Sequence, residues 1–100
     1  MLISISSKIT GDLVVGGTGT TSRSYLQFYN VNVGASFVEV PGSSSYSFHR
    51  ASGNGANSST STHILQVEPG NKLRVRCLRY VGGDTLKLLG NACSITITQL

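Results

Sequence analysis

The sequence has little charge, no tryptophan, and few prolines and cysteines. Only 12 of its 100 residues are charged, and it contains two Pro and two Cys. Lys and Glu, the usual residues of exposed helix surfaces, are nearly absent, and so little Pro excludes a Pro-rich disordered linker. No run approaches the ~18 apolar residues of a membrane-spanning helix. The opening MLISISSKIT already alternates like a strand and has no secretory-signal pattern.

Hydroxyl side chains and glycine take the place of charge. Ser and Thr together supply 24 residues and Gly another 12, so the expected surface is neutral, hydroxyl-rich and rich in turns. Val, Ile, Thr, Tyr and Phe supply strand propensity. A chain of this length allows one domain, residues 1–100, with an adequate core.

Short alternating runs separated by turns predict about eight or nine strands and no helix of two turns. The expected strands are 2–9, 13–15, 25–33, 37–40, 46–49, 64–67, 72–81, 85–89 and 93–100. Residues 10–12 and 68–71 are expected as turns, and 16–24 and 50–62 as exposed polar loops. This pattern predicts an all-β fold, an antiparallel β-sandwich or barrel.

The strand edges suggest self-association. An open sheet edge pairs readily with other chains unless charged side chains protect it, and this chain has few. We therefore expect its sheet margins to be buried against identical subunits.

A row of arginines is the main basic feature. Arg74, Arg76 and Arg79 lie in one predicted strand of a chain whose net charge is +4. A nucleic-acid surface combines a basic stripe with aromatic residues, but no aromatic triplet accompanies this row in the sequence. We expect no nucleic-acid partner and interpret the row as a solvated or subunit-facing strand side.

The two cysteines, Cys77 and Cys93, alternate with apolar residues and are expected to be small core residues with free thiols. A disulfide between adjacent strands stays open as an alternative.

Neither zinc-ligand spacing nor a catalytic constellation is present. Asp12, Glu68 and Asp84 sit beside glycine turns, and His49 and His63 flank the polar loop. We expect no enzyme activity and no cofactor.

The segment ILQVEPGNKLRVRCLRYVGGDTLKLLGNACSITITQL resembles the closing strands of the C1q/tumour-necrosis-factor jelly roll. That family has a leucine-x-x-Gly-Asp turn between strands, with Asn71 here in place of Asp, and its domain ends on a strand. The opening Met1 to Ser6 resembles the family's middle strand. Strands that would precede Leu2 are missing, and SITITQL replaces the usual aromatic-rich final strand.

The resemblance implies a jelly-roll sandwich that forms a symmetric trimer. Low charge with abundant Ser, Thr and Gly also resembles the trimeric heads and decoration proteins of bacteriophage virions. The function expected from this is a virion structural or adhesion module, the head of a phage fibre or spike, that contributes to binding a host-surface glycan or protein receptor. A capsid decoration protein and a monomeric carbohydrate-binding module are the alternatives.

Two residue sets follow from this expectation. Candidate receptor-binding residues lie in or beside the polar loops: Thr18, Thr20, Arg23, Arg50, Asn54 and Asn57. Candidate interface residues are the aromatics Tyr25, Tyr29, Phe37 and Tyr80.

Overall fold

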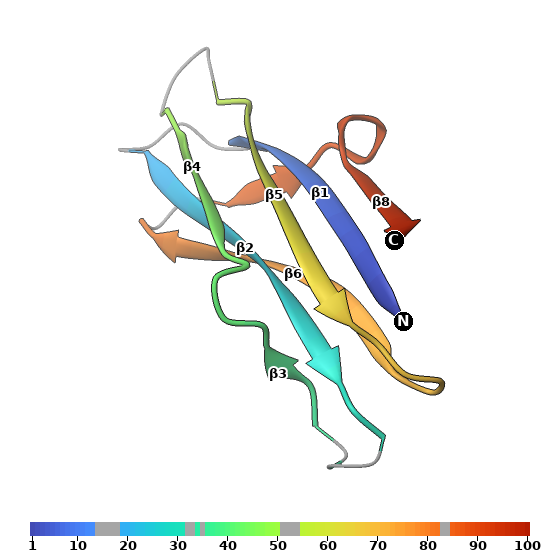
Figure 1. Cartoon of the computed structure of the whole chain (residues 1–100). Coiled ribbons are helices and arrows are strands. Elements are labelled where there is room, and N and C mark those ends of the chain that lie inside the picture. The colour runs from blue at the N-terminus through green and yellow to red at the C-terminus, as the bar shows by residue number, and fades with distance from the viewer. Residues whose placement is uncertain (14–18, 32–33, 35, 51–54, 83–84) are drawn as a thin grey trace.

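The computed structural model describes residues 1–13, 19–31, 34, 36–50, 55–82 and 85–100. These residues form eight β-strands and one short 3-10 turn, arranged as two facing sheets (Figure 1). The elements are β1 (Leu2–Leu13), β2 (Thr20–Tyr29), β3 (Val38–Glu39), β4 (Ser45–His49), β5 (Asn57–Gln66), β6 (Lys72–Val81), β7 (Leu86–Leu88), the 3-10 turn Gly90–Ala92 and β8 (Ser94–Gln99).

Each sheet is built around one central strand. In the first sheet β1 pairs with β5 on one side and with β7 and β8 on the other. In the second sheet β2 pairs with β3 and β4 on one side and with β6 on the other. Every pairing is antiparallel, so the prediction of an all-β antiparallel sandwich is confirmed.

The core lies between the two central strands and is small. Ile5 of β1, Leu26 of β2 and Val40 form its buried centre, because alternation along each strand turns these side chains toward the opposite sheet. Four half-buried side chains pack around this centre: Phe28, Leu65, Leu73 and Val75. With so few large apolar side chains inside, buried hydroxyl groups fill much of the remaining interior.

The turn predicted at 10–12 is wrong, because β1 continues through it to Leu13. Gly11 is a strand residue here, paired with Asn57 on one side and Leu88 on the other. A Cβ at this position would lie 3.3 Å from a ring carbon of His49. Glycine therefore lets the buried histidine approach β1; it does not mark a chain reversal.

The two predicted polar loops are partly strand. β2 begins at Thr20, and β5 begins at Asn57; residues 14–18 and 51–54 lie outside the described part of the chain. The Ser and Thr residues at the starts of β2 and β5 lie beside neighbouring strands that pair with them. A hydroxyl side chain is tolerated on either side of a sheet when it has a hydrogen-bond partner.

The predictions for the later part of the chain agree with the structure. Residues 68–71 form a turn in which the Asn71 amide donates to the Glu68 carbonyl over 3.1 Å, and Gly70 has φ +88°. β6 has the predicted bounds. The chain ends beside its own beginning, since the Leu100 amide donates to the Leu2 carbonyl over 3.0 Å.

Candidate binding surfaces

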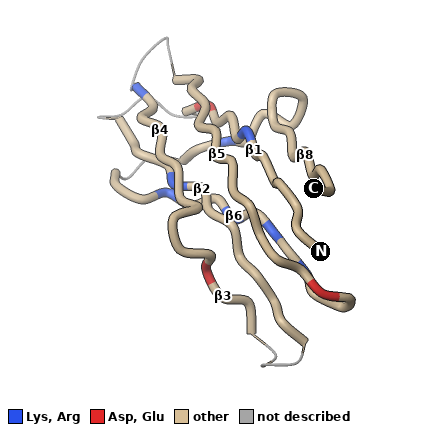
Figure 2. Tube along the Cα trace, in the orientation of Figure 1, with Lys and Arg blue, Asp and Glu red and all other residues tan. Residues whose placement is uncertain are grey.

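The outer side of the second sheet gathers cations and aromatic rings. Lys72, Arg74 and Arg76 of β6 face outward and pair across the ladder with residues of β2. Figure 2 shows Lys and Arg positions along β6 and the neighbouring strand. We call this surface the basic aromatic face; its members are Arg23, Tyr25, Gln27, Tyr29, Phe37, Glu39, Tyr46, Lys72, Arg74, Arg76 and Tyr80.

Aromatic rings hold several of these cations in place. The Arg74 guanidinium lies 4.0 Å from the centre of the Phe37 ring, and its Nε donates to Gln27 Oε1 over 2.8 Å. The Lys72 ammonium lies 5.8 Å from the centre of the Tyr29 ring. Cation–π contacts of this kind are worth roughly 0.5–1 kcal/mol at exposed sites, so their main effect is to restrict where the charges point.

Arg23 differs from the other cations because it is neutralised. Its guanidinium forms an ion pair with Glu39, donates to the Ser44 hydroxyl, and lies 4.4 Å from the centre of the Tyr25 ring. Glu39 is the one acidic residue of the basic aromatic face. The row formed by Lys72, Arg74 and Arg76 therefore keeps its positive charge.

A second surface is the open margin, where the sandwich is not closed. In the described chain β6 pairs only with β2 and β8 only with β1, so each has an edge without a strand neighbour. Ile95 and Ile97 pair with Ser7 and Ile5, two buried residues, and therefore point to the core side of the first sheet. They are nevertheless 54% and 58% exposed, because no strand of the second sheet covers β8.

Beside the open margin a cleft of about 290 Å³ lies between the two sheets. Apolar side chains of Ile9, Leu86 and Leu88 line its first-sheet wall, and Ser22 and Cys77 line the other. Both cysteines are free thiols, as the alternation predicted. Burial raises the pKa of the Cys77 thiol; the Ser24 hydroxyl opposes this shift, and the nearby Cys93 adds to it.

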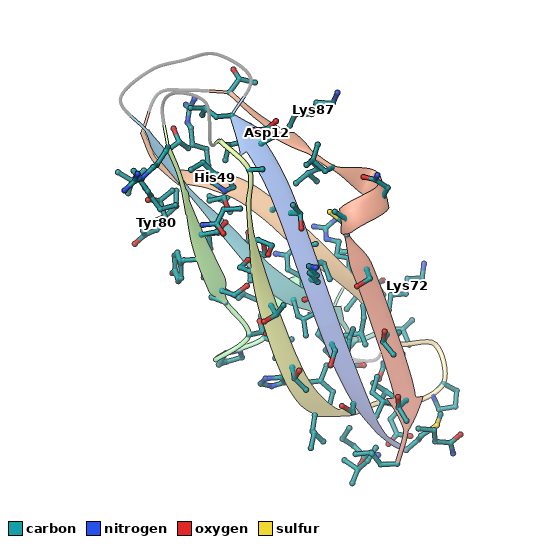
Figure 3. All side chains as sticks on the ribbon, turned by 90° about the horizontal axis from the view of Figure 1, so that it is seen from above. Asp12, His49, Lys72, Tyr80 and Lys87 are labelled. Carbon is teal, nitrogen blue, oxygen red and sulfur yellow. The ribbon has the colours of Figure 1, made fainter. Side chains whose placement is uncertain are left out.

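His49 is the centre of a buried hydroxyl network. It is fully buried, with Nε2 3.1 Å from the Ser22 hydroxyl and 2.9 Å from the Ser47 hydroxyl. Its Nδ1 lies 2.9 Å from the Gly55 carbonyl, which can only accept. Nδ1 therefore carries a proton, and both serine hydroxyls lie within hydrogen-bond distance of Nε2. Figure 3 shows His49 between the sheets, toward the end that carries Tyr80.

The Ser22–His49 contact has the reach of a nucleophile–base pair, but its surroundings favour a structural role. Ser47 occupies the same Nε2, and a backbone carbonyl, not a carboxylate, orients the ring. His63, which flanks the polar loop on its other side, is not among the hydrogen-bond partners of His49.

No sequence signal indicated that His49 points inward, because the alternation along β4 puts Tyr46 and Phe48 on the opposite side. Apolar side chains ordinarily face the core, yet these two are 49% and 52% exposed.

The predicted receptor-binding residues are not all on loops. Thr20 is 1% exposed and starts β2, and Arg23 lies within β2, so neither is the loop residue that was expected. Arg50 and Asn57 are exposed at the end of the sandwich near Phe48, whose carbonyl accepts from the Asn57 amide. Thr18 and Asn54 lie outside the described residues.

The predicted interface residues are brought together on the basic aromatic face. Tyr29 and Phe37 have ring centres 5.4 Å apart, and Tyr80 meets Tyr46 edge-on at 5.1 Å. Tyr25 lies beneath Arg23 on the same side. The sequence did not single out Gln27, and it did not indicate that the arginine row lies against these rings.

No protein-family model, curated protein or solved structure matches this chain. The resemblance to the C1q/tumour-necrosis-factor domain therefore rests on the sequence features given above. Across the described ranges, no group of three or more His, Cys, Asp or Glu residues could hold a metal ion. In the same ranges no helix has the length and apolarity needed to cross a bilayer.

Proposed function

We propose that this protein is a non-enzymatic module of a virion surface, the head of a phage fibre or spike, that works as an assembly of identical copies and contributes to host binding. The observation that supports self-association is the open margin. The family resemblance supports a trimer as the form of the assembly and the virion as its location.

The open margin leaves apolar surface that a partner would cover. Burying an Ile or Leu side chain completely is worth roughly 1.5–3 kcal/mol. Ile95, Ile97 and Leu88 are each a little over half exposed, so covering them would stabilise each chain by roughly 2.5–5 kcal/mol on the same scale. The free edges of β6 and β8 add backbone groups that another strand could pair with.

A second copy is the occupant that the chain's own chemistry favours. The margin is apolar and uncharged along Ile95 and Ile97, which suits a permanent contact between copies better than a transient polar one. The basic aromatic face is a less suitable contact between copies, because burying its cations requires acidic partners. The chain has four acids in total, and Glu39 is already paired. The interface role of Tyr25, Tyr29, Phe37 and Tyr80 stays a prediction.

Light scattering on the purified chain tests assembly directly. We expect a particle of three times the 10.5 kDa chain mass at micromolar concentration. A stable monomer would contradict the proposal.

Two matched substitutions test the place of contact. Ile97→Lys introduces a charge on the core side of β8, whereas Ile64→Lys introduces it on the outer side of the same sheet, at an equally exposed position (58% and 59%). We expect I97K to dissociate the assembly and I64K to leave its mass unchanged, with circular dichroism confirming that both variants stay folded. Dissociation by I64K alone would place the contact on the outer side of the first sheet.

The carbohydrate-binding alternative has one specific observation in its favour, the half-exposed pair Tyr46 and Tyr80 on the basic aromatic face. This alternative does not require assembly. A monomer that binds a neutral glycan in an array, and loses that binding on Tyr80→Ala, would favour it.

A further inference from the structure

We infer that the basic aromatic face is the receptor surface and that its ligand is an acidic polysaccharide, a sugar polymer carrying sulfate or carboxylate groups. The inference rests on the proposed host-binding function and names the class of receptor.

The arrangement of charge is the first argument. Lys72, Arg74 and Arg76 occupy alternate positions of one straight strand, so their side chains leave the sheet about 6.6–6.8 Å apart, in a row. The only acid on this face is neutralised by Arg23. A row of regularly spaced, unneutralised cations is complementary to a polymer that carries an anion on each repeat.

The fixed geometry of the row is the second argument. Phe37 and Gln27 hold the Arg74 guanidinium, and Tyr29 lies under the Lys72 ammonium. Side chains restrained before binding lose less rotamer freedom when the ligand arrives. Guanidinium groups also donate two parallel hydrogen bonds to a carboxylate or a tetrahedral oxyanion, so Arg74 and Arg76 recognise the anionic group and not charge alone.

The exposed tyrosines at the other end of β6 supply a contact for the sugar itself. Tyr46 and Tyr80 are 49% and 55% exposed, and Figure 3 shows Tyr80 far along the molecule from Lys72. An aromatic ring packs against the apolar side of a sugar ring, and the phenol hydroxyl offers a hydrogen bond. One chain can thus contact the anionic groups of a polymer through its cations and a sugar ring further along the same polymer through its tyrosines.

Single-stranded nucleic acid is a poorer fit to the same face. Such binding depends on aromatic rings that are open for bases to stack on. Here the rings of Tyr25, Tyr29 and Phe37 each already have a cation over them, and Tyr25 is only 9% exposed. Along the arginine row, the cations that would hold the phosphates therefore occupy the places where bases would stack. The two open rings, Tyr46 and Tyr80, contact each other at the other end of the face.

Titration calorimetry on the assembled full-length chain tests the inference with three probes: dextran sulfate, unmodified dextran, and an oligothymidylate of the same total charge. The test variant is Arg74→Gln/Arg76→Gln. The control variant Lys8→Gln/Lys87→Gln removes two cations from the first sheet, and both changes lower the net charge from +4 to +2. Lys87 lies beside Asp12 on that sheet, away from the basic aromatic face (Figure 3).

We expect dextran sulfate to bind, dextran not to bind, and oligothymidylate to bind more weakly. R74Q/R76Q should weaken dextran sulfate binding by roughly tenfold and reduce the slope of log affinity against log salt by about two, one for each cation removed. The control should stay within about twofold. Equal losses in both variants, no binding of dextran sulfate, or tighter binding of oligothymidylate would each overturn the inference.

Light scattering on the same samples separates this inference from the proposed function. A trimer that does not bind dextran sulfate overturns the inference and leaves assembly intact. A monomer that binds dextran sulfate through Arg74 and Arg76 contradicts the assembly but supports the inference.

Discussion

Replacing His49 by alanine should destabilise this protein more than any substitution at a half-exposed position. The ring is fully buried and connects β4 to two other segments: Ser22 in β2 and the Gly55 carbonyl just before β5. Its removal leaves a cavity where the ring was and takes one hydrogen-bond partner from each of these groups. The Ser22 and Ser47 hydroxyls keep a 2.7 Å hydrogen bond to each other, and the Gly55 carbonyl still accepts from the Leu13 amide.

The expected loss in unfolding free energy is about 3–5 kcal/mol, a large part of the 5–15 kcal/mol typical of a small domain. Because the chain has no tryptophan, urea unfolding is followed by far-ultraviolet circular dichroism at one fixed chain concentration. The thermal midpoint should fall by at least 12 °C, at about 4–8 °C per kcal/mol for a domain of this size.

His63→Ala is the matched control for H49A. His63 is half-buried in β5, and within the described chain it makes no hydrogen bond or ion pair, so its removal should cost less than about 1 kcal/mol. Equal losses in the two variants, or a loss below about 1 kcal/mol in H49A, would refute the view that the buried hydroxyl network holds this end of the sandwich together.

Two further predictions concern pH and backbone conformation. Because burial raises the pKa of Cys77 above its ordinary 9.0, the unfolded chain loses this proton first, so unfolding free energy should fall as pH rises from 9.0 toward the folded pKa. In the Cys77→Ala variant, the unfolding free energy measured by urea titration at alkaline pH should fall less steeply with pH than in the unchanged protein. Parallel pH dependences in the two proteins would contradict this. Gly82→Ala should cost about 1–3 kcal/mol, since Gly82 has φ +110° and an added Cβ would lie 2.7 Å from the Gly19 carbonyl oxygen. Gly90→Ala, with open space around it, should change thermal stability by less than about 0.5 kcal/mol; a similar loss in both variants would contradict the argument.

Several elements were predictable from local sequence because their signals are local. The turn at 68–71 has Pro and Gly side by side, and β6 alternates between basic and apolar residues from its start to Cys77. The inward position of Cys77 beside Leu73 and Val75 followed from the same alternation, whereas the sequence left a disulfide to Cys93 open. The starts of β2 and β5 were missed because Ser- and Thr-rich segments resemble loops, and only their pairing with β4, β6 and β1 makes them strands.

The candidate site was less predictable than the fold. The arginine row was visible in the sequence, and so were the tyrosines, but Tyr25 precedes Arg76 by 51 positions. Tyr25 meets Arg76 only through the register between β2 and β6. A slip of one residue would turn the arginines toward the core, and no local pattern specifies that register. The interpretation of the arginine row considered only aromatic residues close to it along the chain, whereas the structure supplies them from other segments.

The sequence alone determined that this chain is all-β, because few charges, abundant hydroxyl groups and alternation of period two leave no other way to bury its apolar residues. Only the tertiary structure decided which strands are neighbours. That choice buried His49 among serines, left Ile95 and Ile97 uncovered, and placed Arg74 over Phe37. The physical reason is that strand pairing is a long-range contact, selected by the packing of the whole sandwich and not by any segment by itself.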